Sequence, residues 1–232
     1  MKYNKNLLNT EHGSHPGIEK NLYTVFPRQQ FQKTFMKLDD LKIINRRFMG
    51  GGMSQNYAAI YFMEYYFEAH RFKYLIEFGS QKGALSTYFA NLAGITESLF
   101  FDTFELFPDE VWNVRVHEGC GHWFSKLAEI SPHINYYHQD IFSTVTQEHV
   151  KENMAELGDT FIFCDGGNKI QEFNIYAPLM RKGDRIAVHD WGLEIHYPSI
   201  RQTAERYNLI PDEPYVTSAQ NLATTIMPFR KA

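Results

Sequence analysis

Short apolar runs alternate with amphipathic segments along most of this chain. Five apolar runs have the length of buried strands, at 74–78, 98–102, 134–138, 160–165 and 185–189. Segments with helical spacing of apolar residues lie between and after them, near 84–93, 109–114 with 122–129, 145–156, 169–181 and 198–207. This alternation predicts parallel βαβ units with helices on both faces of one sheet. The chain is therefore predicted to fold as a three-layer α/β sandwich.

The two ends of the chain depart from this alternation. Residues 1–50 are polar and irregular, and we predict an N-terminal extension there, followed by one folded domain over residues 51–232. A helix is expected from residue 55 to about residue 70, with Ser54 as its N-cap. The tail, which includes residues 222–227, predicts two further strands paired as a hairpin.

Composition and charge narrow the class of protein. The 232 residues, of which 44% are hydrophobic, suffice for one domain with a full core. A net charge of −4 without a basic run disfavours nucleic acid as a partner. No apolar run approaches the ~18 residues of a membrane span, and no apolar segment follows the polar N-terminus. The two cysteines form no CxxC pair, so we expect a cytoplasmic protein.

A glycine turn follows the first predicted strand. Glu77 ends the apolar run, Gly79 and Gly83 follow at the spacing Glu-x-Gly-x-x-x-Gly, and a predicted helix begins directly afterwards. Glycine at the carboxyl end of a strand lets a ligand approach the backbone, and the helix presents free N–H groups to it. The tight G-x-G-x-x-G turn of dinucleotide-binding proteins is absent here, so the segment favours S-adenosylmethionine over NAD.

Acidic residues recur at or just after the predicted strands. They are Glu77, Asp102, Asp140, Asp165 and Asp190. Carboxyl ends of parallel strands are where ligands bind in open α/β sheets. A series of carboxylates along one sheet edge therefore predicts a ligand site there.

The order of these segments resembles the class I S-adenosylmethionine-dependent methyltransferases. Within that class, residues 50–230 are most similar to the small-molecule O-methyltransferases of the macrocin and catechol types. The resemblance implies a Rossmann-like, seven-stranded, mostly parallel sheet with one antiparallel strand near an edge. It also implies methyl transfer from S-adenosylmethionine to a hydroxyl of a small acceptor, such as a sugar or a natural-product scaffold.

The resemblance also implies which residues bind the cofactor. Glu77, Gly79 and Ser80 would surround its methionine end, with Gly83 in the same turn and Ser86 reaching the region from the helix. The run Phe100-Phe-Asp-Thr-Phe-Glu-Leu-Phe-Pro108 is close to the macrocin pattern.

In that pattern the carboxylate of Asp102 would accept both ribose hydroxyls. Asp140 would face the adenine amino group, and Ile141 would pack on the ring. Ser54 would belong to a lid that closes over the cofactor after a glycine hinge at 50–52.

A metal site is implied by the segments after the fourth and fifth strands. Asp165 matches the first metal ligand of the family, and His189 with Asp190 occupies the position of its polar pair. A divalent cation there would lower the pKa of the acceptor hydroxyl. The family pair is commonly Asp-Asp or Asp-Asn, and magnesium prefers oxygen ligands. The histidine would therefore favour manganese, iron or zinc over magnesium, or would not be a ligand at all.

The general base is less defined by the resemblance. The macrocin group has a second aspartate where this chain has Gly167, and the catechol type has a lysine where it has Asn168. Lys169 could act as the base only if its pKa were depressed. His189 is the rival base, since its ordinary pKa is already near neutral.

Alternative functions remain open on the sequence alone. One is a metal-independent N- or O-methyltransferase on the same fold. Another is a non-catalytic module that binds the cofactor, and a weaker one is a nicotinamide oxidoreductase. We also consider a homo-oligomer in which the N-terminal extension packs against a second subunit.

Overall fold

The computed structural model describes most of the chain. It covers residues 47–48, 51–52, 57–81, 83–95, 98–111, 128, 132–222 and 224–232. Nearly all of the predicted N-terminal extension lies outside these residues, as does Ser54 with most of its predicted lid. Gly51 and Gly52, predicted as part of a hinge, form strand β2 (Gly51–Gly52), which pairs antiparallel with β1 (Arg47–Phe48).

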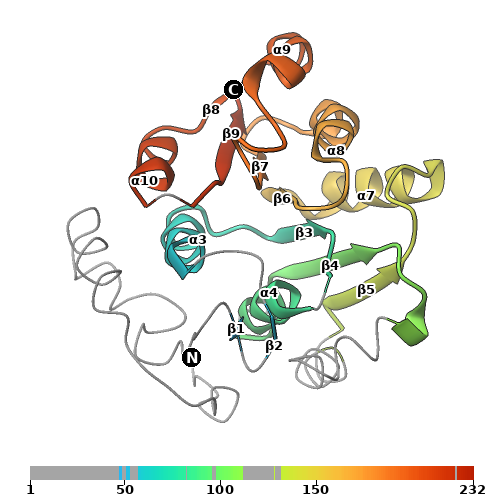
Figure 1. Ribbon diagram of the computed structural model, residues 1–232. Helices are drawn as coiled ribbons and strands as arrows, with labels where there is room; N and C mark the ends of the chain where they lie inside the picture. The colour runs from blue at the N-terminus through green and yellow to red at the C-terminus, as the bar shows by residue number, and fades with distance from the viewer. Residues whose placement is uncertain are drawn as a thin grey trace.

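A seven-stranded sheet forms the centre of the molecule (Figure 1). Its strands, in spatial order, are β5 (Ile134–His138), β4 (Phe100–Glu105), β3 (Tyr74–Phe78), β6 (Thr160–Cys164), β7 (Arg185–Val188), β9 (Met227–Lys231) and β8 (Leu209–Pro211). The first five are mutually parallel, and β9 runs antiparallel to both of its neighbours. The predicted Rossmann-like, mostly parallel sheet with an antiparallel C-terminal strand is thus confirmed.

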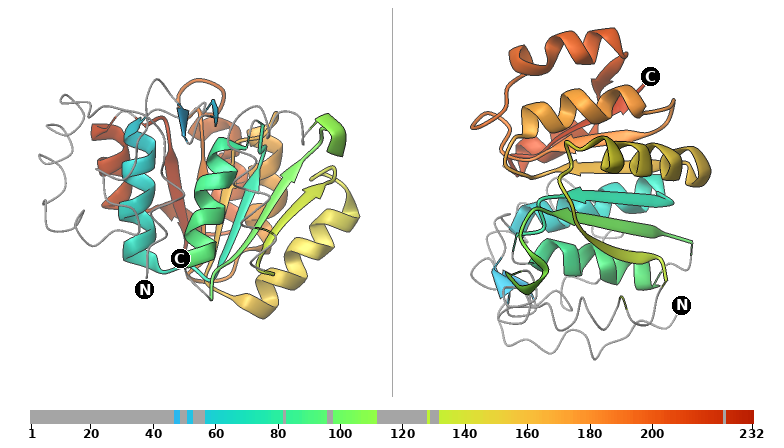
Figure 2. Two further views of the ribbon diagram at one scale, coloured as in Figure 1. Left: turned by 90° about the horizontal axis from the view of Figure 1, so that it is seen from below. Right: turned by 90° about the vertical axis from the view of Figure 1, so that its right-hand side faces the viewer.

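Helices cover both faces of the sheet and complete the three layers (Figure 2). One layer contains α3 (Tyr57–His70), α4 (Ala84–Ile95) and α10 (Tyr215–Asn221), and the other contains α7 (Thr144–Leu157), α8 (Lys169–Tyr176) with a 3-10 turn (Ala177–Leu179), and α9 (Tyr197–Arg206). Because successive strand residues point to opposite faces, Leu75 packs with the first layer while Tyr74 and Ile76 pack with the second. Within the described residues, no helix has both the length and the apolar character needed to cross a bilayer.

Two predicted boundaries differ from the structure in ways that matter. The second strand was expected to end at Asp102, but β4 continues to Glu105. The tail was predicted as a hairpin, and β8 and β9 do pair antiparallel, but α10 lies between them. Of the described residues between 222 and 227, only Met227 belongs to a strand. The remaining strand predictions agree with the structure to within one residue.

Candidate cofactor and catalytic site

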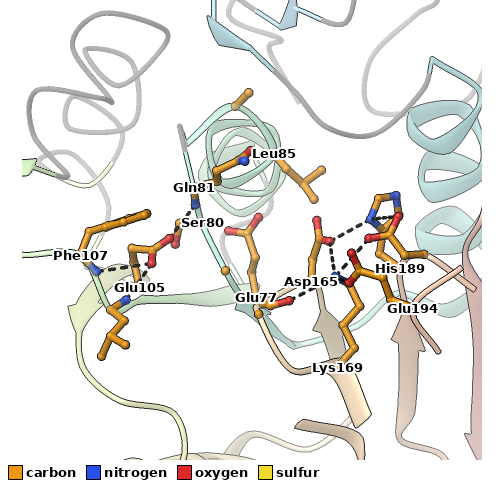
Figure 3. A pocket seen from close by; sticks show the side chains of 16 residues that line it. Glu77, Ser80, Gln81, Leu85, Glu105, Phe107, Asp165, Lys169, His189 and Glu194 are labelled. Carbon is orange, nitrogen blue, oxygen red and sulfur yellow. Dashed lines mark hydrogen bonds and ion pairs between the residues drawn. The ribbon is translucent and has the colours of Figure 1, made fainter. Parts of the chain in front are cut away.

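A pocket of about 640 Å³ opens at the carboxyl edge of the sheet. Its lining comes from the ends of four adjacent strands, in the order β4, β3, β6 and β7, and from the loops that follow them (Figure 3). The chain leaves β3 toward β4 and β5 on one side and later adds β6 and β7 on the other. The pocket therefore straddles the point where the strand order reverses, which is the usual ligand site of open α/β sheets. Its volume suits a small organic ligand.

Glycine in the turn after β3 serves the packing of two loops as well as the access of a ligand to the backbone. Gly79 has a φ of +89°, and a Cβ built on it would lie 2.5 Å from the carbonyl oxygen of Asp165 and 2.7 Å from the Cα of Gly166. Gly79 therefore allows the β3–α4 loop to touch the β6–α8 loop, a reason that the sequence did not show. Gly79 and Ser80 line the pocket, whereas Gly83, which also has a positive φ, lies behind them in the turn.

Glu77 forms the buried floor of the pocket. Its side chain is 1% exposed, and its Oε2 accepts hydrogen bonds from Ser86 Oγ at 2.5 Å and Thr103 Oγ1 at 2.7 Å. Burial raises the pKa of Glu77 to about 8, although the two hydroxyl donors lower it. Ser86 therefore supports Glu77 and does not line the pocket itself. A buried carboxyl group with a raised pKa is suited to receive a cation, because the cation compensates its charge.

Asp102 does not lie where the sequence predicted. It sits inside β4, is 1% exposed, and points toward α7. Its carboxylate accepts hydrogen bonds from Tyr74 Oη at 2.5 Å and Asn135 Nδ2 at 2.9 Å, and His149 Nε2 lies 3.2 Å away. These hydrogen-bond partners offset the cost of burying a carboxylate inside a strand. Asp102 is not a lining residue of the pocket, which disfavours its predicted place at the ribose site.

Glu105 occupies the strand end that was assigned to Asp102. Its Oε2 accepts a hydrogen bond from the Gln81 N–H at 2.8 Å, and its Oε1 accepts one from the Leu106 N–H at 2.8 Å. The carboxylate is thereby fixed against the loop after β3, across the pocket from His189 (Figure 3). Oε1 also accepts a hydrogen bond from the Phe107 N–H at 3.4 Å, so Oε2 is the oxygen that retains a lone pair for a ligand hydroxyl. The only signal for Glu105 in the sequence was a second acidic residue in the same run.

Asp140 and Ile141 follow β5 and border this half of the pocket without lining it. Asp140 is exposed and accepts a hydrogen bond from the Phe142 N–H at 2.8 Å. The Ile141 carbonyl accepts one from Tyr176 Oη. The backbone joins this loop to the end of β4, because Gln139 N–H donates to the Glu105 carbonyl at 3.1 Å. Contact of Asp140 and Ile141 with adenine stays a prediction.

Asp165, His189 and Asp190 come together on the other side of the pocket, as the sequence predicted. Cys164 and Val188 pair across β6 and β7, so the residues that follow them are neighbours. His189 Nδ1 lies 2.8 Å from Asp165 Oδ1 and 3.4 Å from Asp190 Oδ1. One ligand atom from each of the three residues lies within 4.8 Å of the others.

The imidazole of His189 is held by its carboxylate neighbours. Burial lowers the pKa of His189, but the hydrogen bond and charge of Asp165 raise it by more, so the net shift is upward. Nδ1 is engaged by Asp165, and Nε2 makes no hydrogen bond within the described part of the chain. His189 lines the pocket, so Nε2 is the ring nitrogen available to take a proton from a ligand.

Lys169 lies beside the same carboxylates, at the start of α8. Its ammonium is 2.7 Å from Glu194 Oε2, 3.1 Å from the Gly166 carbonyl, 3.1 Å from Asp190 Oδ2 and 3.9 Å from Asp165 Oδ1. Burial lowers the pKa of Lys169, but the hydrogen bond to Glu194 and the charges of the carboxylates raise it by more, so its pKa is raised overall. The raised pKa and the ion pairs disfavour the predicted role of Lys169 as a general base, which would need a depressed pKa.

The same ammonium limits what metal the site could hold. Two of the three predicted ligands, Asp165 and Asp190, already form ion pairs with Lys169. A divalent ion about 4 Å from the ammonium would be repelled by roughly 8 kcal/mol at an effective dielectric constant of 20. The predicted ligands do come together, but with Lys169 in this position they do not fit a divalent cation.

Two further carboxylates of this half were not predicted. Glu172, buried in the first turn of α8, accepts hydrogen bonds from the N–H groups of Gly166 and Asn168, both at 3.3 Å. It thereby holds the loop that carries Asp165 and Lys169. Glu194 lies in the loop after β7. No sequence pattern marks it as a site residue, and only the fold places it next to Lys169.

Comparison with known proteins gives a match in structure and none in sequence. No protein-family model matches the chain, and no curated protein matches it. The solved structure described as "CmcI-N160 apo-structure" has a TM-score of 0.54 at 14% identity, covering 97% of each chain. That described as "cmcI-D160 Mg-SAM" has a TM-score of 0.52 at 14% identity, covering 89% of this chain and 85% of the other. This chain therefore has the Rossmann-like fold of these structures, as its resemblance to the class I methyltransferases implied.

Proposed function

We propose that this protein transfers a methyl group from S-adenosylmethionine to a hydroxyl group of a small molecule. One observation carries the proposal. A single pocket holds the carboxylates of Glu77 and Glu105 at one side and the hydrogen-bonded pair of Asp165 and His189 at the other. Glu77 and Glu105 suit a ligand with a cationic group and neighbouring hydroxyls. The pair of Asp165 and His189 suits removal of a proton. The structure of cmcI-D160 with Mg-SAM, which shares this fold, is consistent with the choice of cofactor.

The cofactor half of the pocket offers groups for the methionine end and the ribose of that molecule. Glu77 would face the ammonium at the methionine end, which would account for a carboxyl group buried there. The backbone at Gly79 and Ser80 would lie against the same end. Glu105 would accept a hydrogen bond from the ribose hydroxyls, in the role first assigned to Asp102.

His189 would be the general base. Nε2 takes the proton of the acceptor hydroxyl, while Asp165 holds Nδ1–H and stabilises the imidazolium that forms. The bound cofactor supplies a methyl group already activated on a sulfonium, so the protein's main task is to align the acceptor oxygen with it. The oxygen gains the methyl group, the sulfur keeps the electrons of the broken bond, and the proton remains on His189.

The pocket lining is not charged throughout. Leu106 lines it and is 67% exposed. An exposed apolar side chain there suits the carbon skeleton of a sugar or natural-product ring. The five lining carboxylates, against one lysine, disfavour an acceptor that carries phosphate.

Calorimetry with S-adenosylhomocysteine tests the cofactor half first. Transfer of a labelled methyl group to a panel of phenols and sugars then tests the reaction, with wild type compared with His189→Gln. We expect this variant to lose at least ~100-fold in rate while its affinity for S-adenosylhomocysteine changes little. His196→Gln is the matched control, because His196 is exposed and outside the pocket lining.

Three outcomes would contradict the proposal in different ways. No binding of S-adenosylhomocysteine would remove the cofactor assignment altogether. Binding without transfer to any acceptor would favour a non-catalytic module on the same fold. Unchanged transfer by His189→Gln would leave the cofactor assignment in place but remove the assignment of the base.

A further inference from the structure

The ammonium group of Lys169 is fully coordinated inside the candidate active site. It donates hydrogen bonds to the Gly166 carbonyl at 3.1 Å and Glu194 Oε2 at 2.7 Å, and it forms an ion pair with Asp190 Oδ2 at 3.1 Å. Asp165 Oδ1 lies at 3.9 Å as a further counter-charge. The lysine is 7% exposed, so its charge is compensated by these oxygens more than by water.

This coordination overlaps the place that a metal ion would take. Asp165 and Asp190 are two of the three residues whose ligand atoms cluster tightly enough for a metal, and both face the ammonium. The third, His189, turns Nδ1 toward Asp165. Figure 3 shows the side chains of Asp165, Lys169, His189 and Glu194 converging on one another. The ammonium group of Lys169 therefore lies among oxygen atoms of the kind that hard metal ions prefer as ligands.

We infer that Lys169 is the resident cation of this site and takes the place of a divalent metal. It acts as a positioning residue, because its buried ammonium is already engaged by Gly166, Asp190 and Glu194. Its ammonium fixes the side chains of Asp190 and Glu194 and places a positive charge next to the pair of Asp165 and His189. Resting on the proposed function, methyl transfer then proceeds without a metal ion, and His189 alone takes the acceptor proton.

Manganese binding tests this inference without any cofactor or acceptor. The probe is Mn²⁺ alone, and the readout is the loss of the electron paramagnetic resonance signal of the free ion when protein is added. Wild type is expected to bind no Mn²⁺ at this site. Lys169→Met, which keeps the length of the side chain and removes its charge, is expected to gain affinity by at least ~100-fold, because the repulsion of the ammonium is gone.

Two comparison variants separate charge from other effects. Lys169→Arg retains the cation and is expected to behave like wild type. Lys151→Met removes an exposed lysine that pairs with Glu148 at 3.3 Å, and it is expected to leave Mn²⁺ binding unchanged. Circular dichroism checks that each variant is folded, and Lys169→Gln replaces Lys169→Met if the latter does not fold.

Specific outcomes would overturn the inference. One is stoichiometric binding of Mn²⁺ by wild type that Asp165→Asn abolishes, since the site would then accept a metal beside Lys169. Another is a folded, uncharged variant at Lys169 that gains no affinity. These results are independent of methyl transfer, so failure to find an acceptor would affect only the proposed function. If transfer is found, its rate should be unchanged by EDTA.

Discussion

Binding of S-adenosylhomocysteine should release a proton from Glu77. Free Glu77 has a pKa raised to about 8, so at pH 7 about 90% of it is protonated. The ligand's ammonium favours the ionised carboxylate and lowers this pKa in the complex. We therefore expect release of ~0.9 proton per ligand bound at pH 7.

The same linkage sets the pH dependence of affinity. The ligand binds the ionised form, so below pH 8 part of the binding free energy is spent on removing the proton. One pH unit corresponds to about 1.4 kcal/mol, so affinity should rise ~10-fold from pH 6 to pH 7 and level off above pH 8. The direction follows from the raised pKa, because a carboxyl group with an ordinary pKa would already be ionised at pH 6.

Calorimetry in two buffers of different ionisation enthalpy measures the released protons directly. The slope of observed enthalpy against the ionisation enthalpy of the buffer should be about −0.9 for wild type at pH 7, because the buffer takes up the released protons, and close to zero for Glu77→Gln. Glu148→Gln, at an exposed position of α7, should behave as wild type. Equal enthalpies in both buffers, together with a flat affinity from pH 6 to pH 8, would refute the reasoning.

Three further predictions concern the cofactor site and its support. Gly79→Ala should lower the melting temperature, because its Cβ would meet backbone 2.5 Å away, whereas Gly167→Ala, with no atom within 4 Å, should not. Glu105→Gln should weaken S-adenosylhomocysteine binding by ~10-fold or more, but Asp102→Asn should act on stability instead, and equal effects on binding would contradict the reassignment. The pKa of His149 is raised by its hydrogen bond to Asp102, so its stabilisation is present below its ordinary pKa of 6.5 and is lost as pH rises through the raised value. Urea unfolding should therefore show His149→Ala closer to wild type at pH 9 than at pH 5.5.

The sequence predicted the fold well where the hydrophobic pattern was uninterrupted. β3 and β5 were predicted with their observed bounds, since each is a short run bordered by polar or turn residues. The meeting of Asp165 and His189 was also predictable, because residues that follow adjacent parallel strands share one edge of the sheet. The α10 helix was missed, because Pro211 and Pro214 suggested a turn and the segment between β8 and β9 has no long periodic pattern.

The predicted site differs from the structure mainly in the positions of charged residues. Asp102 was read as a strand end because a carboxylate inside a buried strand is costly. Tyr74, Asn135 and His149 remove that cost, and they lie 28, 33 and 47 residues away along the chain. Hydrophobic periodicity contains no information about such partners, so the end of the strand was placed three residues too early.

By itself, then, the sequence determined the layers, the sheet edge that carries the pocket and the loops that supply its acidic residues. These features follow from periodicity and from turn residues, which are local properties of the chain. Only the tertiary structure decided which carboxylate faces the pocket, that Gly79 is needed for loop packing, and that Lys169 is held as a cation. Each of these depends on the distance between groups far apart in sequence, and both pKa values and hydrogen bonds are set by such distances.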